Sequence, residues 1–334
     1  MAESLITIDI QLNDDGKQFG TLSVPQSTNS AGWSVYYIPI VVIKNGEGPT
    51  ALLFGGNHGD EYEGPVTLMN LARQLQPEDI RGRVIILPML NRPAVAAGTR
   101  LSPIDGANMN RAFPGQPSDS ITGMIAHFVS STLLPLADLV VDIHSGGSSM
   151  HFLPSVNMHH VEDQQQMEQM LAAGRAWGAP YVFIYRDVAG SGLLPSLAEE
   201  MGKVTLGTEV GSKAQFGPET LGITARGVDN VLQWLGITPA ATLTATEVEP
   251  LLVAAEESAD YVMAPVSGIY QPLAELGDQL SVGDPLGQIH NIEQPEQQPV
   301  SVEALTDGIL MGRRSNPLTI QGECLATLVR PFQL

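Results

Sequence analysis

The chain has 334 residues, of which 43% are hydrophobic and 16% charged, and its 36 acidic residues against 16 Lys and Arg give a net charge of −20. This composition is typical of a globular protein with a real core, arranged as one large domain with an appendage or as two modest domains. The acidic balance excludes nucleic acids and anionic membranes as partners, because both require a basic surface.

The first 48 residues are predicted to form strands at 5–10, 20–25 and 35–43, as an N-terminal β segment joined to the domain that follows. The N-terminus lacks the basic start and the apolar run of a signal peptide. No apolar stretch approaches the roughly 18 residues of a membrane span. We therefore expect a cytoplasmic protein without a membrane partner.

Strands and helices are predicted to alternate between residues 49 and 236. Short apolar runs predict buried strands at 50–54, 83–87, 138–143, 181–185 and 203–209. Apolar residues at helical spacing predict helices at 64–76, from a cap at Ser118 or Asp119 to 134, at 162–177, at 194–201 and at 217–235. This alternation predicts an α/β domain, residues 49–236, with a largely parallel sheet.

Two histidines and a carboxylate follow two of these strands. His58 and Glu61 lie in a Gly-rich turn after the strand at 50–54, and His144 follows the strand at 138–143. Ligands of open α/β sheets gather beyond the carboxyl ends of the strands. A catalytic zinc takes three nitrogen or oxygen ligands from the protein and leaves its fourth position to water. The three residues are predicted metal ligands; a solvated pair and a structural histidine are the alternatives.

A long irregular loop, residues 89–115, separates the two halves of this pattern. It contains Arg92, Arg100 and Arg111, with Asn110 beside the last of them. Long loops in compact domains usually carry function, and the planar guanidinium pairs well with carboxylates. We expect Arg100 and Arg111 to contact an anionic substrate. Arg92 and Arg111 could instead tether the loop to acidic neighbours.

Glu209 is the candidate general base. It ends the predicted strand at 203–209 and is flanked by small residues that leave room for a substrate. A carboxylate in this position can take a proton from water and pass it to a leaving amine. It could also be an ordinary strand-end acid. Glu199 and Glu200, on a predicted helix, are expected to be solvated.

The last third of the chain changes character. Residues 237–258 have little pattern and are expected to be a linker, and residues 259–334 form short strands separated by turn signals. This β module resembles the biotinyl/lipoyl β-sandwich, but it contains no Lys for a carrier role. Cys324, the single cysteine, excludes an intrachain disulfide and a Cys-rich metal site and is expected in a strand.

The combined motifs resemble the succinylglutamate desuccinylase/aspartoacylase family, within the zinc carboxypeptidase-like fold. The matching segments are residues 56–61, 110–115, 142–146 and 208–209, and the C-terminal β module is also typical of the family. The resemblance implies an α/β fold with a mixed sheet flanked by helices, a small C-terminal all-β domain, and one zinc ion per chain held by His58, Glu61 and His144.

The same resemblance implies roles for the remaining site residues. Glu209 would act as general base and acid, and Arg100 would polarise the scissile carbonyl and stabilise the oxyanion. Asn110 and Arg111 would hold a substrate carboxylate. The family's substrates are small N-acyl amino acids, and a homo-oligomer is compatible with the sequence. The native metal stays open, because nitrogen and oxygen ligands accept several divalent ions.

Within the family, residues 99–111 and 192–195 most resemble the ectoine-catabolic branch, which deacetylates N-alpha-acetyl-L-2,4-diaminobutyrate. Such a substrate carries a side-chain ammonium, for which Asp105 and Asp187 are candidate partners. The alternatives are a deacylase of succinylglutamate, acetylaspartate or another acylated amino acid, and a zinc carboxypeptidase acting on short peptides. A non-catalytic binding protein would have lost a ligand or the base, and neither is missing.

Overall fold

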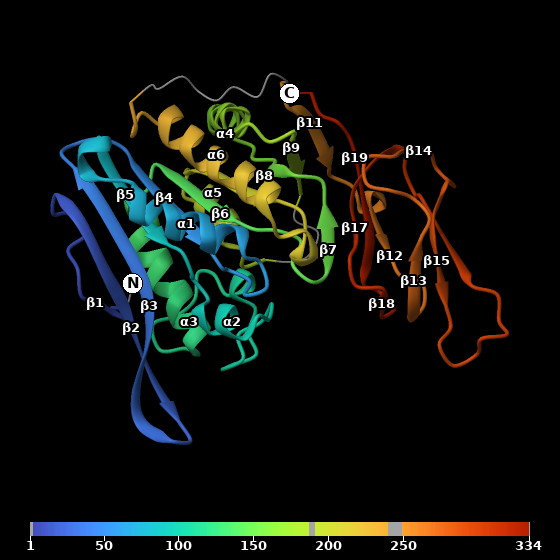
Figure 1. Ribbon diagram of the computed structural model, residues 1–334, viewed down its shortest axis with the longest axis horizontal. Coiled ribbons are helices and arrows are strands. Elements are labelled where there is room, and N and C mark those ends of the chain that lie inside the picture. The colour runs from blue at the N-terminus through green and yellow to red at the C-terminus, as the bar shows by residue number, and fades with distance from the viewer. Residues whose placement is uncertain (1–2, 187–190, 240–248, 334) are drawn as a thin grey trace.

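The computed structural model describes residues 3–186, 191–239 and 249–333. Within these residues a 15-stranded mixed sheet runs through the molecule, and a four-stranded sheet lies at one end of it (Figure 1). The strands of the large sheet are β1 (Thr7–Ile8), β2 (Gly16–Thr28), β3 (Ala31–Asn45), β4 (Thr50–Gly55), β5 (Gly82–Leu87), β6 (Leu139–Ile143), β7 (Met150–Phe152), β8 (Ser155–His159), β9 (Tyr181–Tyr185), β10 (Val204–Glu209), β11 (Leu251–Ala255), β12 (Tyr261–Met263), β14 (Gln279–Leu280), β17 (Gly308–Arg314) and β19 (Cys324–Pro331).

The centre of the large sheet is parallel. β5, β4, β6 and β10 lie side by side in this order, and their carboxyl ends meet at one edge. Every residue of β4, β5 and β6 is buried. These strands are nearly continuous apolar runs because other elements cover both of their faces. The predicted α/β fold with a mixed sheet is confirmed.

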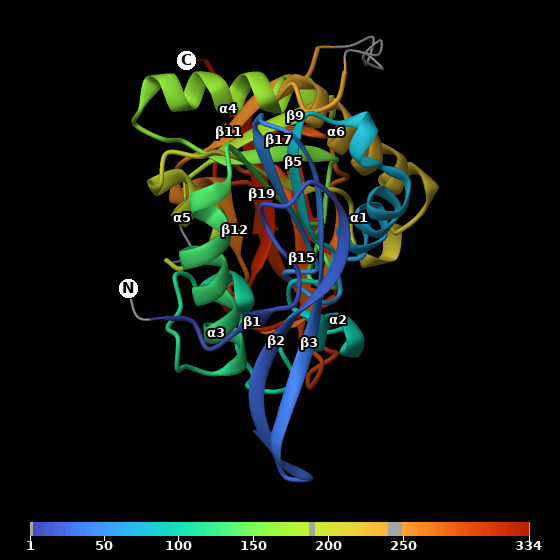
Figure 2. The same cartoon turned by 90° about the vertical axis from the view of Figure 1, so that its left-hand side faces the viewer.

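Helices cover both faces of the sheet (Figure 2). They are α1 (Glu63–Gln74), α2 (Arg92–Ala97), α3 (Ile121–Phe128), α4 (Gln164–Trp177), α5 (Leu194–Glu200) and α6 (Pro218–Trp234), with short helical turns at Pro77–Asp79, Met109–Arg111, Val129–Leu133, Leu134–Leu136, Lys213–Gln215 and Ser258–Asp260. α1, α4 and α6 bury Leu68, Leu171 and Val231 in one core, and α3 and α5 bury Phe128 and Leu194 in a second. Among the described residues, no helix has the length and apolar character needed to cross a membrane.

The C-terminal strands form a small module that is continuous with the large sheet. The second sheet consists of β13 (Gly268–Pro272), β15 (Pro285–His290), β16 (Val300–Glu303) and β18 (Leu318–Thr319). The core of the module contains Tyr270, Leu286 and Leu325. β19 pairs with β11, β12 and β17, so backbone hydrogen bonds join the module to the large sheet. The expected small C-terminal β domain is confirmed.

Some elements differ from the sequence predictions. The segment expected to be a linker, 237–258, contains strand β11 at Leu251–Ala255, because this apolar stretch pairs in parallel with β9. Its part 240–248 lies outside the described residues. β7 and β8 were not predicted. α3 starts after the N-cap Ser120 and ends at Phe128, earlier than expected, because the next turns are of π and 3₁₀ type.

Candidate metal centre and active site

The carboxyl ends of β4 and β6 bring the three predicted ligands together. The strands are parallel neighbours, with Gly55 opposite Ile143. The turn after β4 passes so close to α2 that a Cβ at Gly59 would lie 2.0 Å from the carbonyl carbon of Ala94. Only glycine fits at this point, and this close approach holds the loop that carries two of the ligands.

His58, Glu61 and His144 form one buried cluster. Nδ1 of His58 lies 2.9 Å from Oε1 of Glu61, and Nδ1 of His144 lies 2.9 Å from Oε2 of the same carboxylate. The exposed fractions of the three residues are 3%, 2% and 8%. One ligand atom from each lies within 4.8 Å of the other two. The cluster could therefore hold a metal ion.

Two further side chains orient the imidazoles. Nε2 of His144 lies 2.8 Å from Oδ2 of Asp142, and Nε2 of His58 lies 3.2 Å from Oδ1 of Asn108. Because these oxygens accept, both histidines donate from Nε2, and Nδ1 of each faces Glu61. Two imidazole nitrogens and a carboxylate thus converge, as the ligands of a cation do. The donor set and its orientation fit a zinc site.

The charges within the cluster shift its pKa values. Burial opposes the ionisation of Glu61, but the two imidazoles outweigh burial and hold the pKa of this carboxyl well below its usual range. Burial lowers the pKa of His58. Burial acts in the same sense on His144, where the carboxylates of Asp142 and Glu61 outweigh it and raise the pKa. Glu61 is therefore ionised at neutral pH, as a metal ligand must be.

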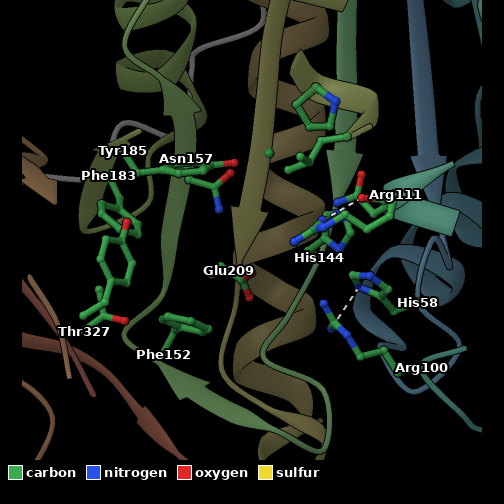
Figure 3. A pocket seen from close by; sticks show the side chains of 15 residues that line it. His58, Arg100, Arg111, His144, Phe152, Asn157, Phe183, Tyr185, Glu209 and Thr327 are labelled. Carbon is green, nitrogen blue, oxygen red and sulfur yellow. Dashed lines mark hydrogen bonds between the residues drawn. The ribbon is translucent and has the colours of Figure 1, made fainter. Parts of the chain in front are cut away.

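Glu209 and Arg100 flank this cluster. Glu209 ends β10, next to β6, and its side chain lies in the middle of the pocket (Figure 3). Burial and then the charge of Glu61 raise the pKa of Glu209 to about 8, and its Oε2 has no hydrogen-bond partner among the described residues. Nη1 of Arg100 lies 3.2 Å from Nδ1 of His58 and 3.5 Å from Oε1 of Glu61. An acid/base group and a cation thus stand beside the candidate metal centre.

The site opens into a cavity of about 200 Å³ with two unlike halves, and Glu209 lies between them (Figure 3). One half is polar and is lined by His58, His144, Arg100, Asn110 and Arg111. The other half is largely aromatic and is lined by Phe152, Asn157, Phe183, Tyr185, Tyr261 and Thr327. β12 and β19 supply the last two residues, so the C-terminal strands contribute to the wall of the pocket.

Asn110 and Arg111 present N–H donors at the polar half. Oδ1 of Asn110 accepts the backbone N–H of Leu194 at 3.0 Å, at the start of α5. This bond orients the amide and leaves its nitrogen, which can only donate, for a ligand. The guanidinium of Arg111 donates to the carbonyl of Asn110 at 2.6 Å, and the side chain is exposed. The pair is suited to binding an anion.

Comparisons with known proteins identify the family. Residues 47–235 match the succinylglutamate desuccinylase/aspartoacylase catalytic domain. The chain belongs to this family. It is 38% identical over 97% of its length to the N-alpha-acetyl-L-2,4-diaminobutyric acid deacetylase of Halomonas elongata, 95% of which is covered. The resemblance stated from the sequence motifs is confirmed, and so is the enzyme class, a hydrolase that acts on an amide bond.

Two solved structures of the family show the same fold over the whole chain. The product-bound ectoine utilization protein EutE (DoeB) from Ruegeria pomeroyi is 37% identical, with a TM-score of 0.94 over 98% of this chain and 99% of that one. A succinylglutamate desuccinylase/aspartoacylase from Rhodobacter sphaeroides is 38% identical, with a TM-score of 0.93 over 98% and 100%. The β strands on either side of the catalytic domain therefore belong to the architecture of these family members.

One alternative and one expectation about polar residues were wrong. Arg92 does not tether the loop to an acidic neighbour: it donates to the backbone carbonyl of Tyr37 at 2.9 Å and lies outside the pocket wall. Glu199 is not solvated. It is buried, and its carboxylate lies 2.6 Å from Nδ1 of His159. Glu200 is exposed, as expected.

Asp105, one candidate partner for a substrate ammonium, instead holds its loop to α3. Its carboxylate accepts from the backbone N–H and the hydroxyl of Thr122 at 2.9 and 3.0 Å, and from the backbone N–H of Ala107 at 3.1 Å. Burial opposes ionisation, but these hydrogen bonds outweigh it and lower the pKa of Asp105. The other candidate, Asp187, lies outside the described residues.

We expect Asp105→Ala to lower the free energy of unfolding by about 1–3 kcal/mol at pH 7, because hydrogen bonds to a charged group are lost. The folded-state pKa is depressed, so this stabilisation is present above the unfolded pKa of about 3.9 and is lost as the pH falls through the folded value. Urea unfolding at several pH values measures it. A raised KM with unchanged stability would instead place Asp105 at the substrate.

Three orienting residues lie in the motifs that carry the resemblance but were given no role there: Asn57, Asn108 and Asp142. Nδ2 of Asn57 donates to Oδ2 of Asp142 at 2.8 Å, so the carboxylate that orients His144 is itself held. A signal for Asp142 existed, because residues two apart at a strand end point to the same side and ligating histidines commonly donate to a carboxylate. The asparagines gave no such signal, because their partners are distant in the sequence.

Proposed function

We propose that this family member is a zinc-dependent deacetylase that converts N-alpha-acetyl-L-2,4-diaminobutyrate to 2,4-diaminobutyrate and acetate. The observation that carries the proposal is the convergence of His58, Glu61 and His144 beside the uncommitted carboxylate of Glu209. The substrate is that named for the Halomonas elongata relative, to which the chain is similar along nearly its whole length. The small cavity suits a substrate of this size.

His58, Glu61 and His144 would hold one zinc ion, which, when bound, polarises a carbonyl and lowers the pKa of water. Glu209 takes a proton from the attacking water as the new C–O bond forms. It then gives this proton to the amide nitrogen as the C–N bond breaks, so that acetic acid and a neutral amine form and the Glu209 carboxylate is regenerated. The second proton of the water passes from the acetic acid to the amine, which gives acetate and an ammonium group and completes the proton balance.

The remaining residues bind and orient the substrate. Arg100 donates from the side of His58 to the carbonyl oxygen, where negative charge develops during attack, and so stabilises the transition state more than the ground state. Asn110 and Arg111 hold the α-carboxylate through N–H donors. With one end of the substrate held in this way, the amide lies beside Glu209.

A deacylase for another N-acylated amino acid is the second candidate, because the family as a whole includes desuccinylases and aspartoacylases. The same metal centre and the same base would serve it. A carboxypeptidase acting on peptides is less well supported, since the cavity is only about 200 Å³ and Tyr261 and Thr327 of the C-terminal strands form part of its wall.

We expect the zinc-loaded protein to release acetate from N-alpha-acetyl-L-2,4-diaminobutyrate. A chelator should abolish this release, because it removes the metal from the three nitrogen and oxygen ligands of the protein. Acetate can be quantified with and without chelator, and zinc added back should restore the rate. Release that persists in protein shown to be metal-free would contradict the mechanism. Hydrolysis of acetylaspartate or succinylglutamate alone would favour the second candidate.

A further inference from the structure

The aromatic half of the pocket has no role in the chemistry described above. Phe152, Phe183, Tyr185 and Tyr261 line it from three strands, β7, β9 and β12. Figure 3 shows the rings of Phe152, Phe183 and Tyr185 on the side of Glu209 that faces away from the histidines. Among the described residues, this half contains no basic side chain, whereas Arg100 and Arg111 both lie in the other half. The two ends of the cavity therefore differ in the charge that they can accept.

Asn157 supplies the side-chain amide at the aromatic end, which also carries the hydroxyls of Tyr185, Tyr261 and Thr327. Asn157 lies on β8 opposite Gly207 of β10, and its Oδ1 lies so close to that strand that a Cβ at Gly207 would approach it to 2.1 Å. The residue is 8% exposed and lines the cavity. No hydrogen bond joins its side-chain amide to another described residue, and the polar atoms of this amide are open to the cavity instead of fully buried. The amide can therefore exchange its hydrogen bonds to water for hydrogen bonds to a ligand.

The surroundings of Asn157 favour a cation as this ligand. The faces of aromatic rings carry negative potential and attract an ammonium group placed over them. The rings of Phe183 and Tyr185 lie 5.6 Å apart, and the ring of Tyr185 packs on His159 at 4.3 Å, so these side chains are held in place. Glu209 borders this half of the cavity as well, on the side of the histidines.

We propose that Asn157 and the aromatic wall form the subsite for the side-chain ammonium of the substrate. The amide oxygen accepts one ammonium hydrogen, and the rings of Phe183 and Tyr185 contact the cation. The inference rests on the proposed function and names the residues that would select 2,4-diaminobutyrate over other amino acids. It replaces the expected acidic partner by an uncharged one within the described residues.

Two substrates that differ only at this group test the inference: N-alpha-acetyl-L-2,4-diaminobutyrate and N-alpha-acetyl-L-norvaline, in which a methyl replaces the ammonium. We expect Asn157→Leu, which removes the acceptor at similar size, to lower the ratio of their kcat/KM values about 10- to 100-fold, mainly through KM. Asn157→Asp should raise this ratio, because a carboxylate accepts more strongly from an ammonium. Phe183→Leu should lower it by about 2- to 30-fold.

Three results would overturn the inference. Equal losses on both substrates in Asn157→Leu would make the residue structural, and thermal unfolding and zinc content would show this independently. A changed preference between acetyl and propionyl substrates, with an unchanged ratio, would assign the aromatic half to the acyl group. Loss of discrimination in Asp187→Asn but not in Asn157→Leu would restore the acidic partner.

The outcome is separable from that of the proposed function. If the unmodified zinc-loaded protein hydrolyses neither substrate, the proposed function fails at that step. Calorimetric binding of 2,4-diaminobutyrate and of norvaline still tests the subsite, because it needs no turnover. Tighter binding of the diamino acid that disappears in Asn157→Leu supports the subsite, and equal binding of the two amino acids overturns it.

Discussion

Replacement of Glu209 by Gln is expected to lower kcat about 10²- to 10⁴-fold while zinc stays bound. Gln has nearly the same shape but cannot take a proton from water or give one to the leaving amine. Oε2 of Glu209 accepts no hydrogen bond from another described residue, so the substitution breaks no structural contact at this atom. Acetate release and zinc content of the purified variant measure the two parts of this expectation.

Asp105→Ala is a suitable control for Glu209→Gln. This substitution also removes a partly buried carboxylate, but that carboxylate accepts hydrogen bonds from Thr122 and lies outside the pocket wall. We expect the control to retain its kcat although its stability falls. A Glu209→Gln variant with a kcat within a few-fold of the unmodified chain would contradict the role of Glu209, and the proton acceptor would then have to be another group.

Most residues of the candidate site could be predicted from the sequence because His58, His144 and Glu209 stand at or just beyond the ends of buried strands. β4, β6 and β10 are apolar runs whose identity is local, and parallel neighbours place their carboxyl ends at one edge. The proximity of His58, His144 and Glu209 can therefore be predicted without knowing the conformation of any loop. Glu61 follows because a tight Gly-rich turn keeps it close to His58.

The aromatic half of the pocket could not be predicted in the same way. Its residues come from β7, β8, β9, β12 and β19, and only the pairing of these strands brings them together. Asn157 depends on the register of β8 against β10, in which it faces Gly207. A shift of one residue would turn its side chain to the opposite face. No local pattern specifies that register.

The loop arginines show the same limit. Arg92 and Arg100 lie in the same predicted loop, and the sequence does not distinguish their roles. In the structure Arg92 donates to a backbone carbonyl of β3, whereas Arg100 contacts His58. The difference lies in α2, which starts at the first of them and carries the chain back towards the turn after β4. This helix has six residues between Asn91 and Gly98, which is too few for the spacing of apolar residues to predict it.

Glu61→Gln is expected to weaken zinc binding by more than about 100-fold, since loss of a residue that merely orients a ligand already costs 10- to 100-fold. Gln keeps the shape of the side chain but offers a neutral oxygen in place of a carboxylate. Its amide N–H can donate to the Nδ1 lone pair of either His58 or His144, so the metal-free fold should persist. Competition with a chromogenic chelator measures the affinity.

Asp60→Asn provides the matched control for this variant. Asp60 is the neighbouring buried carboxylate, 4% exposed, and it accepts the backbone N–H of Ser148 at 2.8 Å instead of facing the histidines. We expect the control to keep its zinc affinity within a few-fold and to gain thermal stability on zinc addition, because a metal that binds only the folded state stabilises it. Glu61→Gln should lose that gain together with acetate release. Zinc-dependent stabilisation that persists in Glu61→Gln would place the metal on other residues and remove the basis for the proposed chemistry.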